Sequence, residues 1–193
     1  MDTLLDPLSY AFFQKGLIVA TISGALLGFI GVYIVLRGMS YIGHGLSHAI
    51  FGGYAAMQLF AAQLYVLGAG LWGVASALAI TNVARRSRLG ADAAIGVVTT
   101  ASFALGVALF ARFGSSGPAF DNALFGSILG ITNAQIFWLL VVTAFTGIVV
   151  FTRYRALMFT TFDPEVANVS GVRTGRTEAL LMVMLSLAIL VTL

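Results

Sequence analysis

The stretch that decides the fold runs from Phe12 to Leu36 and reads FFQKGLIVATISGALLGFIGVYIVL. Only Gln14 and Lys15, near its start, interrupt an otherwise apolar run. A run of about 20 such residues, wound as an α-helix, is long enough to cross the hydrocarbon core of a membrane. We therefore expect this segment to be a transmembrane helix.

The remainder of the chain repeats this pattern. Of its 193 residues, 60% are hydrophobic and 9% are charged, whereas a soluble domain carries about 25% charged residues. The sequence thus predicts an all-α, polytopic transmembrane bundle with about six spans. Hydropathy places them at residues 12–36, 41–60, 63–84, 93–113, 134–152 and 179–193. We expect residues 1–193 to form the N-terminal part of one transmembrane domain, because the last run is short and stops without a flanking anchor.

The basic residues indicate the orientation of the spans, because cytoplasmic loops of membrane proteins carry an excess of Lys and Arg. Eight of the ten basic residues fall in alternate loops. They are Arg37, Arg85, Arg86, Arg88, Arg153, Arg155, Arg173 and Arg176, and the other side keeps Lys15 and Arg112 beside the acidic Asp2, Asp6 and Asp121. We therefore expect the N-terminus outside and the arginine-bearing loops in the cytoplasm.

Several function classes are excluded by what the sequence contains. It has no cysteine, which excludes disulfides, thiolate zinc sites and a cysteine nucleophile. The net charge is only +3, and the basic residues lie between apolar runs, so they act as topology determinants and predict no nucleic-acid partner. A phosphate-binding loop with glycines and lysine, a nucleophile elbow and a zincin helix are all missing from the sequence.

Two loops are long enough to hold structure of their own. The cytoplasmic segment FDPEVANVSG (Phe162 to Gly171) contains Asp163 as a helix cap, Pro164 in the first turn and Glu165 at the positive end of the dipole. Gly171 is a helix stop. We expect a short helix there on the cytoplasmic face, and a short interfacial helix at residues 120–129 outside.

Other residues have local structural interpretations. Asp92 is expected to cap the fourth span and to face Arg85, Arg86 and Arg88, and Asn133 to cap the fifth. Gly24 and Gly28 have the GxxxG spacing that lets membrane helices approach closely, which predicts helix packing rather than chemistry.

The two histidines of the chain, His44 and His48, both lie in the second span, in the stretch GHGLSHA. Residues four apart share one face of a helix, and two imidazoles at that spacing can bind one divalent ion. Ionisable groups inside a span are costly and mark pathways or sites. Neighbouring Gly45 and Ser47 are small enough to permit close helix approach or an open channel.

Another interpretation of the two histidines stays open. An intramembrane histidine is often an interhelical contact, and His44 is close enough to the start of its span to lie near the cytoplasmic interface. Two ligands are also an incomplete shell, since zinc sites use three or four protein ligands. Any ion would bind loosely or recruit further ligands.

Four blocks of sequence, taken in order, resemble the ABC-3 family of bacterial metal-importer membrane subunits. The first is GVYIVLRGMSYIGHGLSHAIFGG (Gly31 to Gly53), and the next are DAAIG (Asp92 to Gly96) and LFGSIL (Leu124 to Leu129). The last is FDPEVANVSGV (Phe162 to Val172). Together they extend over about 140 residues, which is more specific than any single motif.

This resemblance implies a function and a set of partners. The chain would be a multi-pass permease of the bacterial cytoplasmic membrane that imports zinc, manganese or iron by alternating access, and not itself an enzyme. Its partners would be a cytoplasmic ATPase, a second permease subunit, an extracellular solute-binding protein and membrane lipid. No cofactor would be bound permanently, because the metal ion is the transported substrate.

The resemblance also assigns roles to residues. His44 and His48 would contact the metal, with Ser47 and Asp92 as signature residues of the pathway. The coupling element that docks on the ATPase would contain Asp163, Pro164, Glu165, Ala167 and Gly171. Two positions depart from the family pattern, since His44 and Ser127 stand where the family has acids. Imidazole suits zinc and iron, whereas carboxylate suits manganese, so His44 favours zinc or iron slightly.

Three other functions compete with metal import. A permease for chelated iron or another small nutrient would have the histidines lining a pathway without ligation. A metal-dependent membrane enzyme would need a third ligand and a general base, which the spans lack. A passive channel would not need the short cytoplasmic helix.

Overall fold

The computed structural model describes residues 6–39, 41–86, 90–113 and 130–193, and every regular element in these ranges is helical. Several sequence predictions lie outside the described residues. They concern the helix expected at 120–129 and the residues Arg88, Asp121 and Ser127. The elements are η2 (Asp6–Ser9), α1 (Ala11–Leu36), α2 (Ile42–Phe60), η3 (Ala62–Leu64), α3 (Tyr65–Arg86), α4 (Ala91–Phe113), α6 (Asn133–Phe162), α7 (Pro164–Val169) and α8 (Thr174–Thr192).

Five of the described helices, α1, α3, α4, α6 and α8, are long and apolar enough to cross a membrane. The predicted second span forms as the 19-residue helix α2 but is not among these five. His44, His48 and several glycines dilute its apolar content, and α2 packs mainly against α4 and α3. The predicted six spans therefore comprise five helices of membrane-spanning composition and one interior helix.

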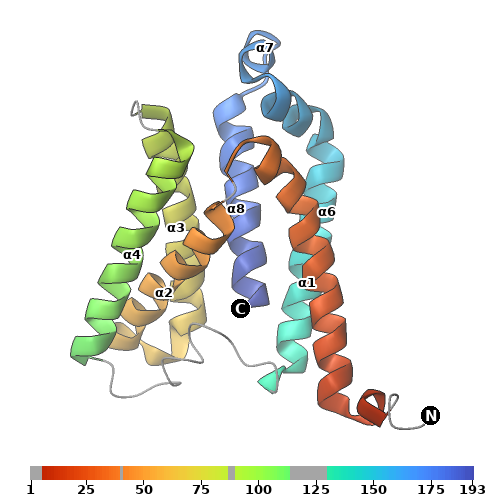
Figure 1. Ribbon diagram of the computed structural model, residues 1–193, viewed down its shortest axis with the longest axis vertical. Helices are drawn as coiled ribbons and strands as arrows, with labels where there is room; N and C mark the ends of the chain where they lie inside the picture. The colour runs from red at the N-terminus through yellow and green to blue at the C-terminus, as the bar shows by residue number, and fades with distance from the viewer. Residues whose placement is uncertain (1–5, 40, 87–89, 114–129) are drawn as a thin grey trace.

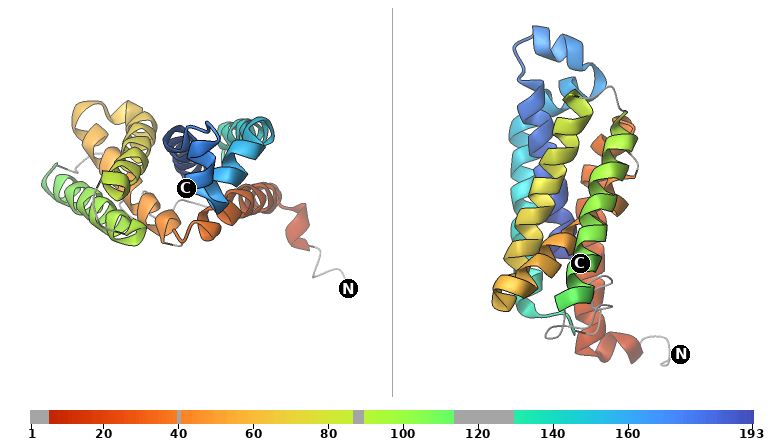
Figure 2. Two further views of the ribbon diagram at one scale, coloured as in Figure 1. Left: turned by 90° about the horizontal axis from the view of Figure 1, so that it is seen from above. Right: turned by 90° about the vertical axis from the view of Figure 1, so that its left-hand side faces the viewer.

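The helices form two groups joined by α2 (Figures 1 and 2). One group contains α3 and α4, and the other contains α1, α6 and α8. From the end of α1, α2 runs diagonally into the first group, and it begins at a lower level than the upper ends of α3, α4 and α6 (Figure 1). The two groups also contact each other directly, because α3 packs against α8.

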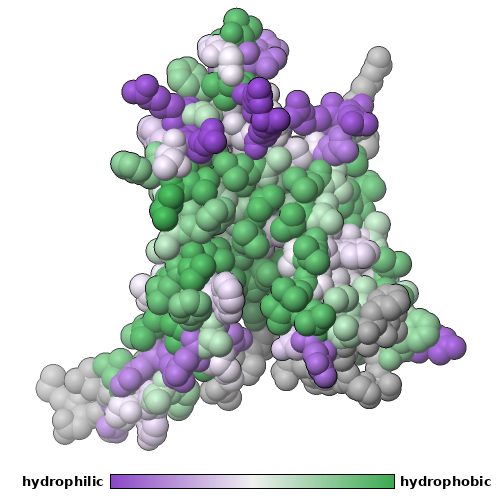
Figure 3. Space-filling view, turned by 180° about the vertical axis from the view of Figure 1, so that it is seen from behind, coloured by the Kyte–Doolittle hydropathy of each residue, from purple (hydrophilic) through white to green (hydrophobic). Residues whose placement is uncertain are grey.

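All the described cytoplasmic segments of the predicted topology meet at one end of the bundle, which we call the arginine-rich end. At this end α1, α3 and α6 end, and α4 and α8 begin (Figure 1). Helix α7 is located at the same end. Helix η2 and the start of α1 lie at the opposite end. A band of hydrophilic residues covers the arginine-rich end, and an apolar belt lies beneath it (Figure 3). The alternation predicted from the basic residues is thus the one the helices follow.

Two helices extend further than the hydropathy pattern indicated. The fifth span was predicted at 134–152, but α6 continues through Arg153 and Arg155 to Phe162. Likewise α8 begins at Thr174 instead of residue 179. Charged residues mark the surface of the membrane and do not by themselves end a helix; α6 ends before Pro164, which lacks a backbone N–H.

The predicted helix caps need small corrections. Thr132, rather than Asn133, is the N-cap of α6, because its hydroxyl and the Gln135 side chain form a capping box. Gln135 Oε1 accepts from the Thr132 backbone N–H at 2.8 Å. Asp92 is the second residue of α4, so it adds negative charge to the first turn instead of capping it.

Three glycines of α1 have open space at the position where a side chain would be. A Cβ built on Gly24, Gly28 or Gly31 would meet no atom within 4 Å. The packing predicted from the GxxxG spacing is therefore absent among the described residues, and close helix approaches occur instead at glycines of α2, α3 and α4.

Candidate functional site

Glycines bring α2 close to α4, and this approach fixes the position of the histidines. A Cβ on Gly45 would lie 2.9 Å from Thr99 Cγ2 of α4, and one on Gly52 would lie 2.8 Å from the Ser102 carbonyl oxygen. On the α4 side, a Cβ on Gly106 would lie 2.8 Å from the Gly52 Cα atom. The prediction that small residues beside the histidines permit close helix approach is confirmed.

A second close contact holds α2 against α3. A Cβ on Gly53 would collide with the backbone carbonyl of Gly68, and one on Gly68 would collide with Met57. Backbone atoms cannot move aside without shifting the helix, so this contact requires glycine at position 53. Phe51, with 2% of its surface exposed, and the fully buried Leu46 complete the packing of α2.

The two histidines lie together on α2 as their spacing predicted. The ring centroids of His44 and His48 are 4.5 Å apart, and the rings are nearly perpendicular at 85°. His44 is exposed, whereas His48 is partly buried and contacts the Phe103 ring of α4 at 4.9 Å. The two rings therefore lie beside each other on one face of α2.

The described residues add no third ligand to this pair. Ser47 Oγ donates to the His44 carbonyl oxygen at 2.7 Å, so its hydroxyl proton is engaged by the backbone of its own helix. Asp92 is exposed at the start of α4, and no group of three His, Asp or Glu side chains comes together in the described ranges. The described ranges thus offer two imidazoles side by side and no third His, Asp or Glu next to them.

The short helix predicted at the arginine-rich end is α7, and its cap is the one the sequence indicated. Asp163 Oδ1 accepts from the Val166 backbone N–H at 2.9 Å, and Pro164 occupies the first helical turn. Glu165 lies in that turn. After the last turn, Gly171 has a φ of 82°, and the Val172 N–H donates to the Ala167 carbonyl oxygen at 2.9 Å. This backbone conformation explains why glycine follows the helix.

One face of α7 is anchored and another is free. Ala167 is fully buried, and α7 packs against α6 and α8. In α7, Val169 is 91% exposed and Val166 49%, and the neighbouring Phe162, the last residue of α6, is 65% exposed. An exposed apolar surface at the end of a bundle marks a site where another protein can bind.

Arg37 has a structural role that the sequence did not reveal. Its Nε–H donates to Thr161 Oγ1 of α6 at 3.2 Å, and its Nη2 atom is buried without a hydrogen-bond partner among the described residues. Burial lowers the pKa of the Arg37 guanidinium, and the charge of Glu178 on α8 opposes that shift. Arg37 therefore links the end of α1 to the two helices that flank α7; its contact with α6 joins residues 124 positions apart.

Comparison with known proteins agrees with the resemblance seen in the sequence. Residues 9–193 match the model of the ABC 3 transport family. The chain is 36% identical over 180 residues to the manganese transport system membrane protein MntC of Halalkalibacterium halodurans, covering 93% of this chain and 61% of the relative. It is also 28% identical over 192 residues to a probable iron transport system membrane protein of Haemophilus influenzae, covering 70% of that relative.

A solved structure shares the arrangement of the helices. PsaBC from Streptococcus pneumoniae, in complex with Fab, matches with a TM-score of 0.78 and 29% identity, over 98% of this chain and 68% of that chain. This chain spans about three fifths of the length of several curated relatives, 61% for the Halalkalibacterium protein. Because the family model covers the helices, the histidine pair and the α7 segment alike, the chain belongs to the ABC 3 transport family.

Proposed function

We propose that this chain is part of the membrane-spanning permease of an ATP-driven importer of divalent transition-metal ions. His44 and His48 contact the ion transiently, and α7 transmits the movement of a cytoplasmic ATPase. A second permease subunit and an extracellular solute-binding protein complete the importer in the bacterial cytoplasmic membrane. The single observation that carries the proposal is the pair of imidazoles, 4.5 Å apart, on a helix packed within a membrane bundle.

The weakness of the histidine pair is consistent with transport. Imidazoles bind a metal only when neutral, and two of them hold an ion less firmly than the three or four ligands of a structural site. High affinity would therefore be a property of the delivery protein, and the permease would release its ion readily.

The relatives suggest which metal should be tested first. Several are named for manganese and others for iron. His44 alone slightly favours zinc or iron, because manganese prefers carboxylate ligands. We propose manganese as the first substrate to test, with iron second, and expect the His44→Asp variant to favour manganese over zinc more than the parent chain does.

Uptake by cells that express the complete transporter tests the metal contacts. Wild type, His44→Ala and His48→Ala are compared at equal membrane expression, with manganese, iron and zinc offered separately. We expect both substitutions to abolish uptake of the one metal that wild type accumulates. Thr100→Ala, at an exposed position of the neighbouring helix α4, is the control and should leave uptake unchanged.

The same uptake assay, with each metal also offered as a chelate, distinguishes the alternatives. Uptake that survives both substitutions would show that the histidines are packing residues, and the metal-contact proposal would fail. Accumulation of a chelated metal, but not of the free ion, would instead support a permease for a small chelate.

The coupling role of α7 is tested at its exposed apolar face. Val169→Asp places a charge on a side chain that is 91% exposed, so the permease should still fold. We expect loss of the co-purifying ATPase and of uptake. Asn133→Asp adds the same charge at the opposite end of the bundle and is the control. Retention of the ATPase by the Val169→Asp variant would contradict docking at α7.

A further inference from the structure

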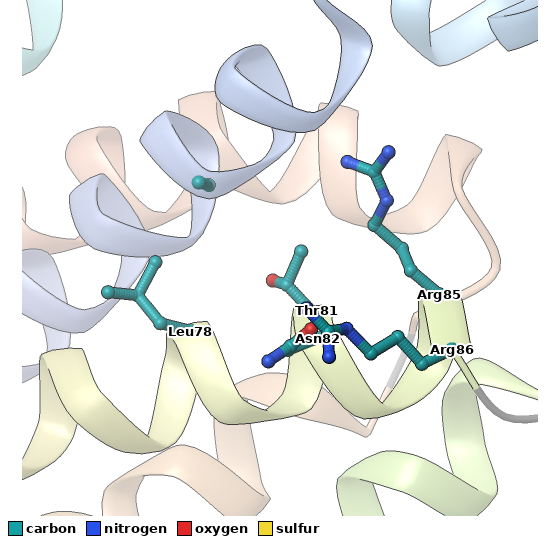
Figure 4. A pocket seen from close by; sticks show the side chains of 6 residues that line it. Leu78, Thr81, Asn82, Arg85 and Arg86 are labelled. Atoms are coloured by element: carbon teal, nitrogen blue, oxygen red, sulfur yellow. The ribbon is translucent and has the colours of Figure 1, made fainter.

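A pocket of about 420 Å³ opens between α3 and α8 at the arginine-rich end. Its lining consists of Leu78, Thr81, Asn82, Arg85, Arg86 and Ala179 (Figure 4). The volume is in the range of about 300–1,000 Å³ that is typical of small-ligand sites. The pocket shares none of its residues with the histidine pair or α7.

The charge of the pocket selects an anion. Among the residues that the structure describes, two guanidinium groups and no acidic side chain line it. Arg85 extends toward α8, where its guanidinium occupies the space that a side chain on Gly175 would fill, and Arg86 runs back along α3 over Asn82 (Figure 4). Two positive charges would repel a divalent cation, so the pocket does not suit the ion that the importer carries.

The polarity of the lining changes with depth. Leu78 precedes Arg85 by seven residues and therefore lies about 10 Å further from the arginine-rich end, and its side chain is 40% exposed. The Thr81 hydroxyl donates its proton to the Ala77 carbonyl oxygen of the same helix at 3.0 Å. That proton is therefore not available to a molecule in the pocket. Ala179 of α8 adds another apolar group. The pocket is thus cationic at its mouth and apolar toward the membrane interior.

We propose that this pocket binds an anionic phospholipid, with Arg85 and Arg86 on its phosphate and its acyl chain along Leu78 and Ala179. Arginine matches the geometry of phosphate oxygens, and basic pockets between transmembrane helices on the cytoplasmic side are known to bind lipid headgroups. The apolar depth favours a lipid over a soluble phosphate, which would leave Leu78 and Ala179 without a partner. This site is independent of the metal-transport proposal.

Lipid binding to the complete transporter, purified in detergent, tests the proposal. Phosphatidylglycerol is titrated, and bound lipid is counted by native mass spectrometry, with phosphatidylcholine as the neutral comparison. We expect wild type to prefer phosphatidylglycerol and the Arg85→Gln/Arg86→Gln variant to bind it about 25-fold more weakly, from about fivefold per arginine. The Arg153→Gln/Arg155→Gln variant removes the same charge from exposed positions of α6 and should bind like wild type.

Two further arms make the outcome decisive. Leu78→Ser should weaken phosphatidylglycerol binding and leave inorganic phosphate binding unchanged. If inorganic phosphate displaces the lipid at millimolar concentration, or if both arginine pairs reduce lipid binding equally, the proposal of a lipid site is overturned. If the double variant does not yield monodisperse complex, the single variant Arg86→Gln decides, with about fivefold weaker binding expected.

Discussion

Helices α1 and α2 both contain several glycines, but these glycines have different surroundings in the structure. Gly24 and Gly28 of α1 face open space, with no described atom within 4 Å of an added Cβ. On α2, a Cβ at Gly53 would collide with the Gly68 backbone and one at Gly52 would lie 2.8 Å from the Ser102 carbonyl oxygen. A small residue in a membrane helix permits a close approach, but the partner helix decides whether one occurs.

This difference matters for the histidines. Because α2 is held by backbone contacts on two sides, His44 and His48 are carried by a helix that cannot rotate freely. Helix α1 contacts α6 and α8, and its glycine-bearing face is free among the described residues. Substitutions to alanine at four glycines measure the contrast, since each adds the same methyl group to a different environment.

Gly53→Ala should have the largest effect. Its Cβ would meet the Gly68 carbonyl, and backbone atoms can yield only if α2 and α3 separate. We expect a loss of stability of about 3 kcal/mol or more, the upper part of the range for overpacked cores. The measurement is the thermal midpoint of the purified transporter. Wild-type stability in this variant would show that the two helices do not approach as closely as described.

Gly45→Ala should have an intermediate effect. Its Cβ would lie 2.9 Å from Thr99 Cγ2 and 3.2 Å from Ile95 Cγ2, which are side-chain atoms of α4. Thr99 is β-branched, and its hydroxyl donates to the Ile95 carbonyl oxygen at 2.8 Å, so it rotates only at some cost. We expect a loss of about 1 kcal/mol.

Thr99→Ala provides the partner for a double-mutant cycle with Gly45→Ala. The combined variant should recover most of the stability lost in Gly45→Ala, because the added methyl group then has space. Additive losses in the cycle would contradict the contact between these two positions.

The sequence predicted much of the fold because local signals were strong. Hydropathy located every long helix of the described ranges, and the Asp163-Pro164-Glu165 start and the Gly171 stop defined α7. The helix ends were less accurate: Arg153 and Arg155 indicate where the membrane ends, and a helix can continue in water. Thr132 and Asn133 are both good caps, and only Gln135, three residues after Thr132, distinguishes them.

The candidate site was only partly predictable, for a physical reason. The spacing of His44 and His48 determines that they share a face, but it does not reveal that Phe103 of α4 contacts His48. Arg37 was interpreted as a topology signal, whereas its contact with Thr161 depends on how α1 and α6 pack. Contacts between distant segments require the tertiary arrangement, which a local pattern does not contain.

Gly175→Ala should have a small effect although its Cβ also meets a close neighbour. That neighbour is the guanidinium of Arg85, the far end of a flexible side chain. Arg85 is exposed and can move into water, so we expect a change in stability within about 0.5 kcal/mol, as for surface substitutions. A loss comparable to that of Gly53→Ala would show that Arg85 is fixed in place, and Arg85→Ala in the same background should then restore stability.

Gly28→Ala should have the smallest effect, and its sign should be opposite to that of Gly53→Ala. The added Cβ meets no described atom within 4 Å, and alanine is a better helix former than glycine by up to about 1 kcal/mol. The variant should therefore melt at or slightly above the wild-type temperature. If the isolated chain behaves so while the assembled transporter loses stability, another chain covers this face of α1. The glycines of α1 would then permit a close approach between chains, as the glycines of α2 do between helices of one chain. A loss in the isolated chain itself would contradict the open surroundings of Gly28.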